Sequence, residues 1–270
     1  MAERRTEHVM GTAVTVEIRD RAVPRRALER AFAWLRWVDR TFSTYDEASE
    51  ISRLNAGELA LPEAHPLVRK VLARCDALRA TTDGYFDARA PLPGGVDPSG
   101  LVKGWAVDVA FAGLRRAGAR AFCIEAGGDL RVAGGPWRVG IRHPHRRGHV
   151  AAVVVLGSGA VATSGAYERG PHVIDPHSGR PPVGTLSVTI IDRALAQADV
   201  HATAAFAPTH TVPPQGMQAW AAPDPNGAVV ATLGGGLPIQ ITEVRGAWAH
   251  VLCSNGWTGW VDGRIIGVAR

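Results

Sequence analysis

The chain has 270 residues, of which 46% are hydrophobic and 20% are charged, a composition that is ordinary for a globular protein and excludes wholesale disorder. At ~150 residues per domain, this length predicts one large domain or two smaller ones. The formal charge is +5, and all of the basic residues except Lys70 and Lys103 are arginines dispersed along the sequence. Such a balance attracts small anions and gives no indication of a nucleic-acid partner.

The three cysteines, Cys75, Cys123 and Cys253, lie too far apart for a metal-binding motif and form no disulfide framework. They indicate buried thiols in a reducing compartment. No apolar run approaches the ~20 residues that a membrane span needs. The first residues lack the apolar segment of a secretory or lipoprotein leader. We therefore expect a cytoplasmic location for this sequence.

Residues 1–207 mix helix and strand signals, which predicts an α+β domain with a largely antiparallel sheet and packed helices. A strand is expected over residues 13–18. Apolar residues at helical spacing predict helices over residues 24–40, 66–82 and 100–117. Further strands are then expected over residues 121–125, 137–142, 150–156, 160–163 and 186–191, followed by a helix over residues 194–206.

The composition changes after residue 207. Three prolines within residues 208–215 predict an extended linker, because proline fixes φ and cannot donate to a strand ladder. Residues 216–270 then carry closely spaced turn signals. Between the turns, short strands are expected over residues 217–221, 229–233, 238–244, 248–252 and 259–261. This pattern predicts a second, small all-β domain with the pattern of a barrel.

Lys103 is the first candidate for a chemical role. It lies near the start of the helix predicted over residues 100–117, behind a Gly-, Ser- and Asp-rich approach. Since this chain uses Arg almost everywhere else, a Lys indicates that a compact ammonium is wanted. Helix N-termini favour anions, so a phosphate contact is one interpretation. A surface lysine in a capped helix fits the residue type equally well.

Asp199 and Thr203 are one helical turn apart, which places a carboxylate and a hydroxyl on one face. Oxygen ligands of this kind suit Mg²⁺, although the spacing alone fits an exposed Asp and a back-bonded Thr better. His172 precedes a turn at Pro176 and is a candidate general acid/base or phosphate contact, or a histidine bonded to the turn. The Gly-Gly-Asp at residues 127–129 is more typical of a turn than of a phosphate cradle.

Eight short motifs occur in an order that resembles the ApbE family, the FAD:protein FMN transferases. They are Met10-Gly-Thr12, Phe42-Ser-Thr-Tyr-Asp46 with Ser49 to Asn55, Gly84-Tyr-Phe-Asp87, Asp97 to Gly104, Glu125-Ala-Gly-Gly-Asp129, Ala162-Thr-Ser-Gly165, His172 to Pro176 with Ser178 to Pro181, and Ala198 to Thr203. The resemblance covers about 200 residues, and its specificity comes from the order of the motifs, since each motif alone is weak.

This resemblance implies the fold of that family and Mg²⁺-dependent transfer of the FMN moiety of FAD to a Thr or Ser hydroxyl of a target flavoprotein. It implies a flavin site lined by Met10, Tyr45, Tyr85, Phe86 and Asp87, with Tyr45 stacked on the isoalloxazine. Further FAD contacts are implied for Asp97 and Lys103, and for Ile174 through its backbone. The implied metal ligands are the Gly100 carbonyl, the Asp199 carboxylate and the Thr203 hydroxyl. His172 and Asp199 are the implied catalytic residues.

Two alternatives follow from the same comparison of motifs. Some family members carry Asn at the position of Tyr45 and hydrolyse FAD to FMN and AMP, so Tyr45 favours transfer over this pyrophosphatase reaction. Family members usually continue past the Asp-to-Thr helix, whereas this chain passes directly into a proline-rich segment. An inactive flavin-binding or wall-binding protein with a shortened catalytic domain is therefore the second alternative.

Residues 216–270 resemble a bacterial SH3-like domain, most clearly in Trp248-Ala-His-Val251 and in the Gly-Trp-Thr-Gly-Trp-Val run over residues 256–261. The resemblance implies a peptide or cell-wall ligand. Tryptophans that serve only as the core of a packing module are the other interpretation.

Overall fold

We analysed a computed structural model of the chain, which describes residues 3–20, 23–144, 146, 148–166, 170, 173–183, 185–253 and 255–268. The chain divides into two compact units. The larger unit comprises Met1–Ser164 and Thr189–Thr203, and the smaller comprises Gly165–Val188 and Ala204–Arg270. Among the described residues, no helix combines the length and the apolar character needed to cross a membrane.

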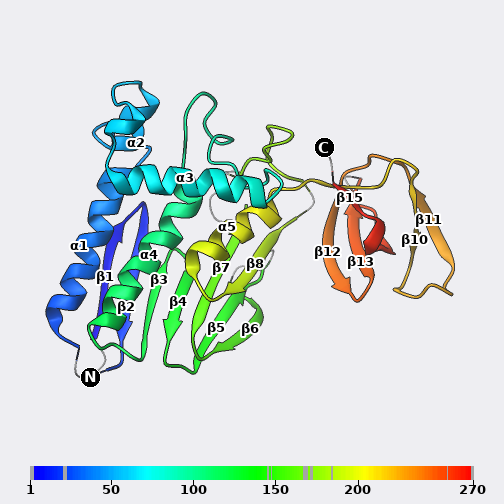
Figure 1. Cartoon of the computed structure of the whole chain (residues 1–270). Coiled ribbons are helices and arrows are strands. Elements are labelled where there is room, and N and C mark those ends of the chain that lie inside the picture. The colour runs from blue at the N-terminus through cyan, green and yellow to red at the C-terminus, as the bar shows by residue number, and fades with distance from the viewer. Residues whose placement is uncertain are drawn as a thin grey trace. The chain divides into compact units, whose positions relative to one another are not determined.

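A six-stranded sheet forms the base of the larger unit (Figure 1). Its strands lie in the order β1 (Glu3–Val9), β2 (Thr12–Ile18), β3 (Phe122–Ala126), β4 (Asp129–Ala133), β7 (Gly159–Gly165) and β8 (Ser187–Asp192). The pairs β1–β2, β2–β3, β3–β4 and β4–β7 are all antiparallel. Alternate side chains of β2, including Val14 and Val16, are fully buried, as expected for a sheet with one covered face. The predicted α+β class with a largely antiparallel sheet is confirmed.

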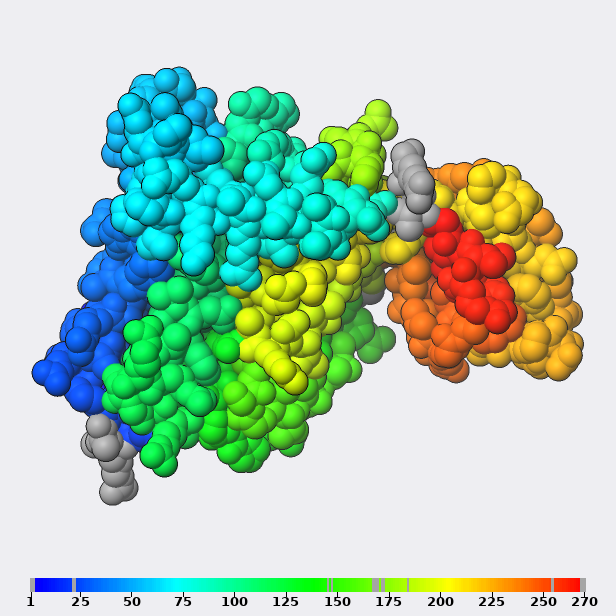
Figure 2. Space-filling model, in the orientation of Figure 1, coloured from blue at the N-terminus to red at the C-terminus, as the bar shows by residue number. Residues whose placement is uncertain are grey.

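Helices cover one face of this sheet. Those that lie over it are α1 (Arg25–Phe42), α4 (Ser99–Arg116) and α5 (Leu195–Phe206). Helix α2 (Glu50–Asn55) packs against α1, and α3 (Pro66–Thr81) against α4, with a 3₁₀ turn at Leu61–Glu63 between α2 and α3. Leu28, Phe32 and Leu35 form the buried stripe of α1, which is the periodicity that predicted this helix. In Figure 1, α1, α4 and α5 lie over the sheet and α3 crosses above them. In Figure 2 the same helices form the surface that faces the viewer.

Strands β5 (Trp137–Arg142) and β6 (Val150–Leu156) pair with each other as a separate two-stranded sheet. Trp137 is buried and packs with Cys123 and Val132 of the main sheet. The three cysteines of the chain are buried thiols without disulfides, as the sequence predicts. Burial raises the pKa of Cys75 and of Cys123 to about 12, which makes both thiols poor nucleophiles.

The C-terminal part of the smaller unit is a five-stranded antiparallel sheet. Its order is β11 (Val229–Leu233), β10 (Met217–Trp220), β14 (Thr258–Asp262), β13 (Trp248–Cys253) and β12 (Ile239–Arg245). All five strands were predicted. The described pairings leave β11 and β12 as edges, so the sheet is not a closed barrel.

Part of the proline-rich segment over residues 208–215 belongs to this small sheet domain. Strand β9 (His210–Thr211) pairs with β15 (Gly267–Val268). Val212 is fully buried in the core with Met217 and Ile239. The prolines therefore flank a short anchored stretch, whose Val212 N–H also donates to the Leu237 carbonyl at 2.9 Å.

Candidate functional site

Two hairpin tips meet at one end of the larger sheet. Met10 and Gly11 form the two-residue turn between β1 and β2, with φ values of 55° and 67°. Gly127 and Gly128 form the turn between β3 and β4, with φ values of 60° and 93°. Positive φ at both turn positions matches the right-handed twist of hairpin strands, but it is unusual for Met. A Cβ on Gly127 would lie 2.7 Å from Thr12 Oγ1, so the two tips are in contact.

The second turn leads directly into Asp129, the first residue of β4. Its side chain is only 3% exposed. Asp129 Oδ1 accepts a hydrogen bond from the Thr163 backbone N–H at 2.9 Å, which ties β4 to β7. Its Oδ2 pairs with the Lys103 ammonium of α4. The Gly-Gly-Asp segment is therefore a turn, as predicted, but the turn delivers a buried carboxylate to the site.

Helices α4 and α5 touch backbone to backbone above these turns. A Cβ on Gly104 would lie 2.8 Å from the Cα of Ala196 and 2.8 Å from the Leu195 carbonyl oxygen, so only glycine permits this approach. One turn further along α4, Asp108 accepts hydrogen bonds from the Leu195 and Ala196 N–H groups at 3.0 and 2.9 Å. Asp108 thus caps the start of α5 in the manner of an N-cap side chain.

This crossing places Asp199 of α5 beside Lys103. Asp199 Oδ2 lies 3.6 Å from Lys103 Nζ, and the Asp199 side chain is 8% exposed. Burial raises the pKa of the Asp199 carboxyl to about 7, and the Asp129 charge acts in the same direction, whereas Lys103 and the Gly104 N–H oppose the shift. The site therefore combines two buried carboxylates with one ammonium and carries an excess of negative charge when both carboxyls are ionised.

Contacts among the described residues bring only some of the predicted metal ligands together. Thr203 Oγ1 lies 3.3 Å from Ser164 Oγ at the end of β7, and Asp199 is one turn earlier on the same helix. Gly100 lies in the first turn of α4, against the buried ring of Phe86. Asp199 Oδ2 is buried and accepts no hydrogen bond from the described residues. An orphaned carboxylate oxygen beside a hydroxyl fits an oxygen-preferring cation such as Mg²⁺.

Such a cation would depend on few protein ligands. Within the described part of the chain, no three His, Cys, Asp or Glu side chains gather around one point. Mg²⁺ usually keeps several waters and takes one or two carboxylates together with substrate phosphates. The donor set of Asp199, Thr203 and a backbone carbonyl is compatible with that behaviour.

The predicted flavin residues other than Met10 lie on the loops between α1 and α4. Tyr45 is 96% exposed, on the loop after α1. Phe86 is buried, and Asp87 accepts hydrogen bonds from Arg79 Nε at 2.7 Å and from the Arg89 N–H at 2.9 Å. Tyr85 is half-buried beside them. Asp97 accepts from the Ser99 N–H at 2.9 Å, directly before α4.

The remaining predicted residues belong to the smaller unit. Ile174 is half-buried and precedes Asp175, whose backbone N–H donates to the Arg180 carbonyl at 2.8 Å across a tight turn. Asp175 is fully buried and accepts the His177 N–H at 2.9 Å. His172 lies outside the described residues, so its predicted catalytic role stays a prediction.

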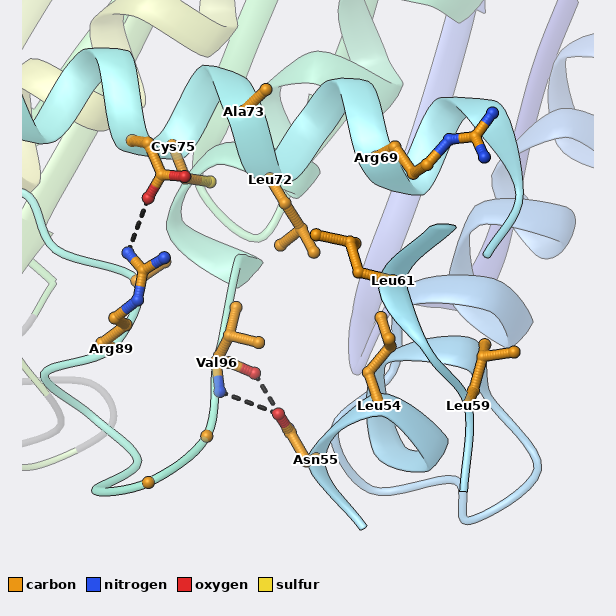
Figure 3. Close-up of a pocket in the computed structure, with 14 residues that line it drawn as sticks. Leu54, Asn55, Leu59, Leu61, Arg69, Leu72, Ala73, Cys75, Arg89 and Val96 are labelled. Atoms are coloured by element: carbon orange, nitrogen blue, oxygen red, sulfur yellow. Dashed lines mark hydrogen bonds and ion pairs between the residues drawn. The ribbon is translucent and has the colours of Figure 1, made fainter. Parts of the chain in front are cut away.

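A cavity of about 470 Å³ adjoins the loop that carries Asp87 and Asp97 (Figure 3). Its walls come from α2, the 3₁₀ turn, α3 and residues 88–96. They combine aliphatic side chains, which include Leu54, Leu59, Leu61, Leu72 and Val96, with polar and charged ones such as Arg69 and Asp76. Asn55 closes one side by bonding both the N–H and the carbonyl of Val96, at 2.8 and 3.0 Å. Arg89, paired with Asp76 at 2.6 Å, supplies charge at the rim. The volume is in the range of small-molecule sites.

The small sheet domain carries aromatic side chains on the face opposite its core. Trp220 and Trp260 are neighbours on β10 and β14, and His250 is opposite Trp260 on β13. The rings of Trp220 and Trp248 meet edge to face at 5.0 Å. The buried Trp220 indole N–H has no hydrogen-bond partner among the described residues. These tryptophans are thus outside the apolar core, which is built from residues such as Val251 and Val261.

Sequence reasoning assigned no role to Asp129, Ser164, Gly104 or Asp108. Asp129 and Ser164 lie within recognised motifs, and the available signal was a charged or polar residue at the end of an otherwise apolar strand. Gly104 and Asp108 act through α5, about 90 residues later in the chain, so no local pattern marks them.

Comparison with solved structures finds the same fold. An ApbE protein from Thermotoga maritima superposes with a TM-score of 0.69 at 25% identity, covering 76% of this chain and 86% of that chain. The flavinyl transferase ApbE of Pseudomonas stutzeri gives a TM-score of 0.65 at 27% identity, covering 76% and 83% of the two chains.

Sequence comparison agrees with the structural one. FAD:protein FMN transferases of Rhodobacter capsulatus and Vibrio cholerae are 36% and 37% identical over 151 and 123 residues, or 51% and 40% of this chain. These matches span 29% and 37% of the two relatives' own lengths. A bacterial SH3 domain profile matches residues 214–266. The profile of the ApbE family matches residues 10–91 and 91–228, and the chain therefore belongs to the ApbE family.

Proposed function

We propose that this protein transfers the FMN moiety of FAD to a Thr or Ser hydroxyl of an acceptor flavoprotein, with Mg²⁺ as cofactor. The observation that carries the proposal is the buried cluster of Lys103, Asp129 and Asp199, built where the family's motifs converge. The relatives named above as FAD:protein FMN transferases support the assignment of the chemistry.

The reaction exchanges the phosphoanhydride bond of FAD for a phosphoester bond to the acceptor. The acceptor hydroxyl oxygen attacks the phosphorus of the FMN half of the pyrophosphate, the bridging P–O bond breaks, and AMP leaves with that bond's electron pair. The hydroxyl proton must pass to a base, for which His172 and Asp199 are the candidates. The raised pKa of Asp199, about 7, allows it to take a proton near neutral pH when no cation is bound.

The chain's own groups would act mainly by charge and position. When bound between Asp199, Thr203 and the Gly100 carbonyl, Mg²⁺ would offset the negative charge of the pyrophosphate and of the transition state. Lys103 supplies a second positive charge at the same end of α4. Burial lowers the local dielectric constant, so each of these charges acts more strongly than it would in water.

The test is incubation of the purified chain with FAD and Mg²⁺, with and without an apo-flavoprotein that carries a Thr flavinylation site. Covalent flavin fluorescence on that acceptor in a denaturing gel is the expected result. Release of FMN and AMP without labelling would assign a pyrophosphatase instead. Binding of FAD without any turnover would assign an inactive flavin-binding protein.

The cavity beside Asp97 is proposed to receive an aromatic end of FAD, because its lining residues Ala88 and Val96 are chain neighbours of Asp87 and Asp97 and its leucines suit a flat apolar group. Leu72→Trp would fill it from α3. We expect this change to raise the Kd for FAD at least about tenfold, since a displaced ring loses its apolar contacts. Fluorescence titration with FAD measures the effect.

The control for Leu72→Trp is Ala33→Trp, an exposed position on α1. It adds the same indole away from the cavity and is expected to leave the Kd unchanged. Equal Kd values for FAD in the two variants would show that the cavity is not part of the FAD site. The unfolding midpoint of Leu72→Trp is measured alongside, so that weak binding by a misfolded protein is recognised.

For the small sheet domain we propose a peptide or cell-wall ligand on the aromatic face formed by Trp220, Trp248, His250 and Trp260. A partner is supported by the partial exposure of Trp220 and Trp248, and the Trp220 indole N–H donates to no acceptor among the described residues. Quenching or a blue shift of tryptophan fluorescence on addition of soluble peptidoglycan fragments is the expected result. If the tryptophan fluorescence does not change with such fragments, these tryptophans have a structural role only.

A further inference from the structure

Lys103 lies between two buried carboxylates that come from different elements. Asp129 reaches it from β4 and Asp199 from α5. The two contacts are unequal. The ammonium pairs directly with Asp129 Oδ2, whereas its distance to Asp199 Oδ2 is 3.6 Å, longer than a hydrogen bond.

Asp129 is also the more firmly held of the two carboxylates. It begins a central strand, its side chain is 3% exposed, and its Oδ1 accepts the Thr163 N–H at 2.9 Å. With one oxygen fixed to the sheet, the other has a defined position from which it holds the ammonium. The Gly127-Gly128 turn, with both φ values positive, fixes where the strand starts.

Asp199 retains an oxygen for another partner. Asp199 Oδ2 and Asp129 Oδ2 are both buried without a regular hydrogen bond from the described residues, but Asp129 Oδ2 is in direct contact with the ammonium, whereas Asp199 Oδ2 lies 3.6 Å from it. A buried carboxylate oxygen without a hydrogen bond is costly, and such groups in native proteins call for a ligand or a functional reason. Thr203, one turn along α5, offers a hydroxyl on the same helix face.

We propose that Asp129 is a positioning residue, which holds the Lys103 ammonium on its own carboxylate and thereby leaves Asp199 Oδ2 open to a divalent cation. This inference rests on the metal site of the proposed function. If Asp129 were neutral, Asp199 would be the nearest charged carboxylate to the ammonium among the ion pairs of the described residues. Lys103 would then move toward Asp199 and compete with the cation for the same oxygen.

The first experiment measures cation binding without FAD. Mn²⁺ alone is titrated into the metal-free full chain, and free Mn²⁺ is followed by its paramagnetic resonance signal. Asp129→Asn is expected to weaken binding about tenfold or more, whereas Lys103→Met strengthens it several-fold by removing the competing charge. In the Lys103→Met background, Asp129→Asn should cost at most about threefold, because no ammonium is left to be positioned.

Comparing the effect of Asp129→Asn on Mn²⁺ affinity with Lys103 present and with Lys103→Met distinguishes a positioning residue from a ligand. An equal loss from Asp129→Asn in both backgrounds would show that Asp129 acts on the cation directly, and no loss in either would show that it does not act; each result overturns the proposal. Lys70→Met is the matched control, since Lys70 is the other lysine of the chain and is exposed on α3. It should leave Mn²⁺ affinity unchanged.

A second experiment observes Lys103 itself in the metal-free protein. Because the chain has only two lysines, labelling with [ε-¹³C]lysine gives two side-chain signals, and Lys70 serves as an internal reference. Asp129→Asn should shift the Lys103 signal more than Asp199→Asn does. The opposite order would overturn the proposal. If the parent binds no Mn²⁺, the proposed metal site fails, and the lysine signals still decide the role of Asp129.

Discussion

Asp199→Asn is expected to reduce FMN transfer at least about a hundredfold while changing the affinity for FAD by less than about threefold. A cation held by Asp199 acts mainly on charge that develops as the pyrophosphate is cleaved, so its loss appears in turnover rather than in substrate binding. Initial rates of acceptor labelling at several Mg²⁺ concentrations measure the first effect, and FAD titration measures the second. Activity that survives a chelator, or an unshifted Mg²⁺ midpoint in the variant, would contradict the assignment.

The same substitution is expected to stabilise the metal-free protein at alkaline pH. Burial raises the pKa of Asp199 from 3.8 in the unfolded chain to about 7 in the fold. Between these values the folded state binds the extra proton, so this group lowers the free energy of unfolding as pH rises through that window. Because Asn cannot ionise, the Tm of the Asp199→Asn variant should exceed that of the parent at pH 8 and match it near pH 4.

Magnesium provides the control for this stability effect. At pH 8 it should raise the Tm of the parent, because a cation that binds only the folded state stabilises it by mass action. The same addition should leave Asp199→Asn unaffected. Thr203→Val should show a smaller loss of the magnesium effect, since it removes one neutral oxygen and keeps the shape of the side chain.

The second large effect is expected for Gly104→Ala. Its new Cβ would lie 2.8 Å from backbone atoms of Ala196 and Leu195, which cannot rotate away as a side chain could. Helix α5 must therefore shift, at a cost of about 1–3 kcal/mol in the free energy of unfolding. The shift also moves Asp199, and a displacement of about 1 Å at a reacting site can lower the rate about a hundredfold.

Gly113→Ala is the matched control, because Gly113 lies on the same helix and a Cβ there would meet nothing within 4 Å. Removing a glycine from a helix interior at such a position should stabilise the protein by about 0.5–1 kcal/mol. Urea unfolding and acceptor labelling are measured for both variants. Equal behaviour of Gly104→Ala and Gly113→Ala would show that the close approach of the helices is not required.

The sequence allowed the amphipathic elements to be predicted. Helix α1 follows from the stripe that includes Leu28 and Leu35, and its observed bounds differ from the expected ones by only one residue at the start and two at the end. Strand β1 was not predicted, because Glu3–Val9 is mostly polar and charged. It becomes a strand through pairing with β2 and through ion pairs such as Glu7 with Arg36 at 2.5 Å.

The candidate site could be predicted as a set of residues but not as an arrangement. Lys103 and Asp199 were singled out from residue type and spacing, and the structure brings them together. The part played by Asp129 depends on Lys103 and Thr163, which come from other elements. Such a contact leaves no periodic trace in the sequence, since it is set by how the sheet and two helices pack.

The two hydrogen bonds that Asp108 accepts at the start of α5 have a consequence for local opening motions. The first amides of a helix normally lack partners and exchange their hydrogens with solvent rapidly. Here the N–H groups of Leu195 and Ala196 are bound by a carboxylate of another helix. Their deuterium uptake should therefore be slow and should follow the detachment of α5 from α4, which makes these two amides a direct probe of how often Asp199 leaves the site.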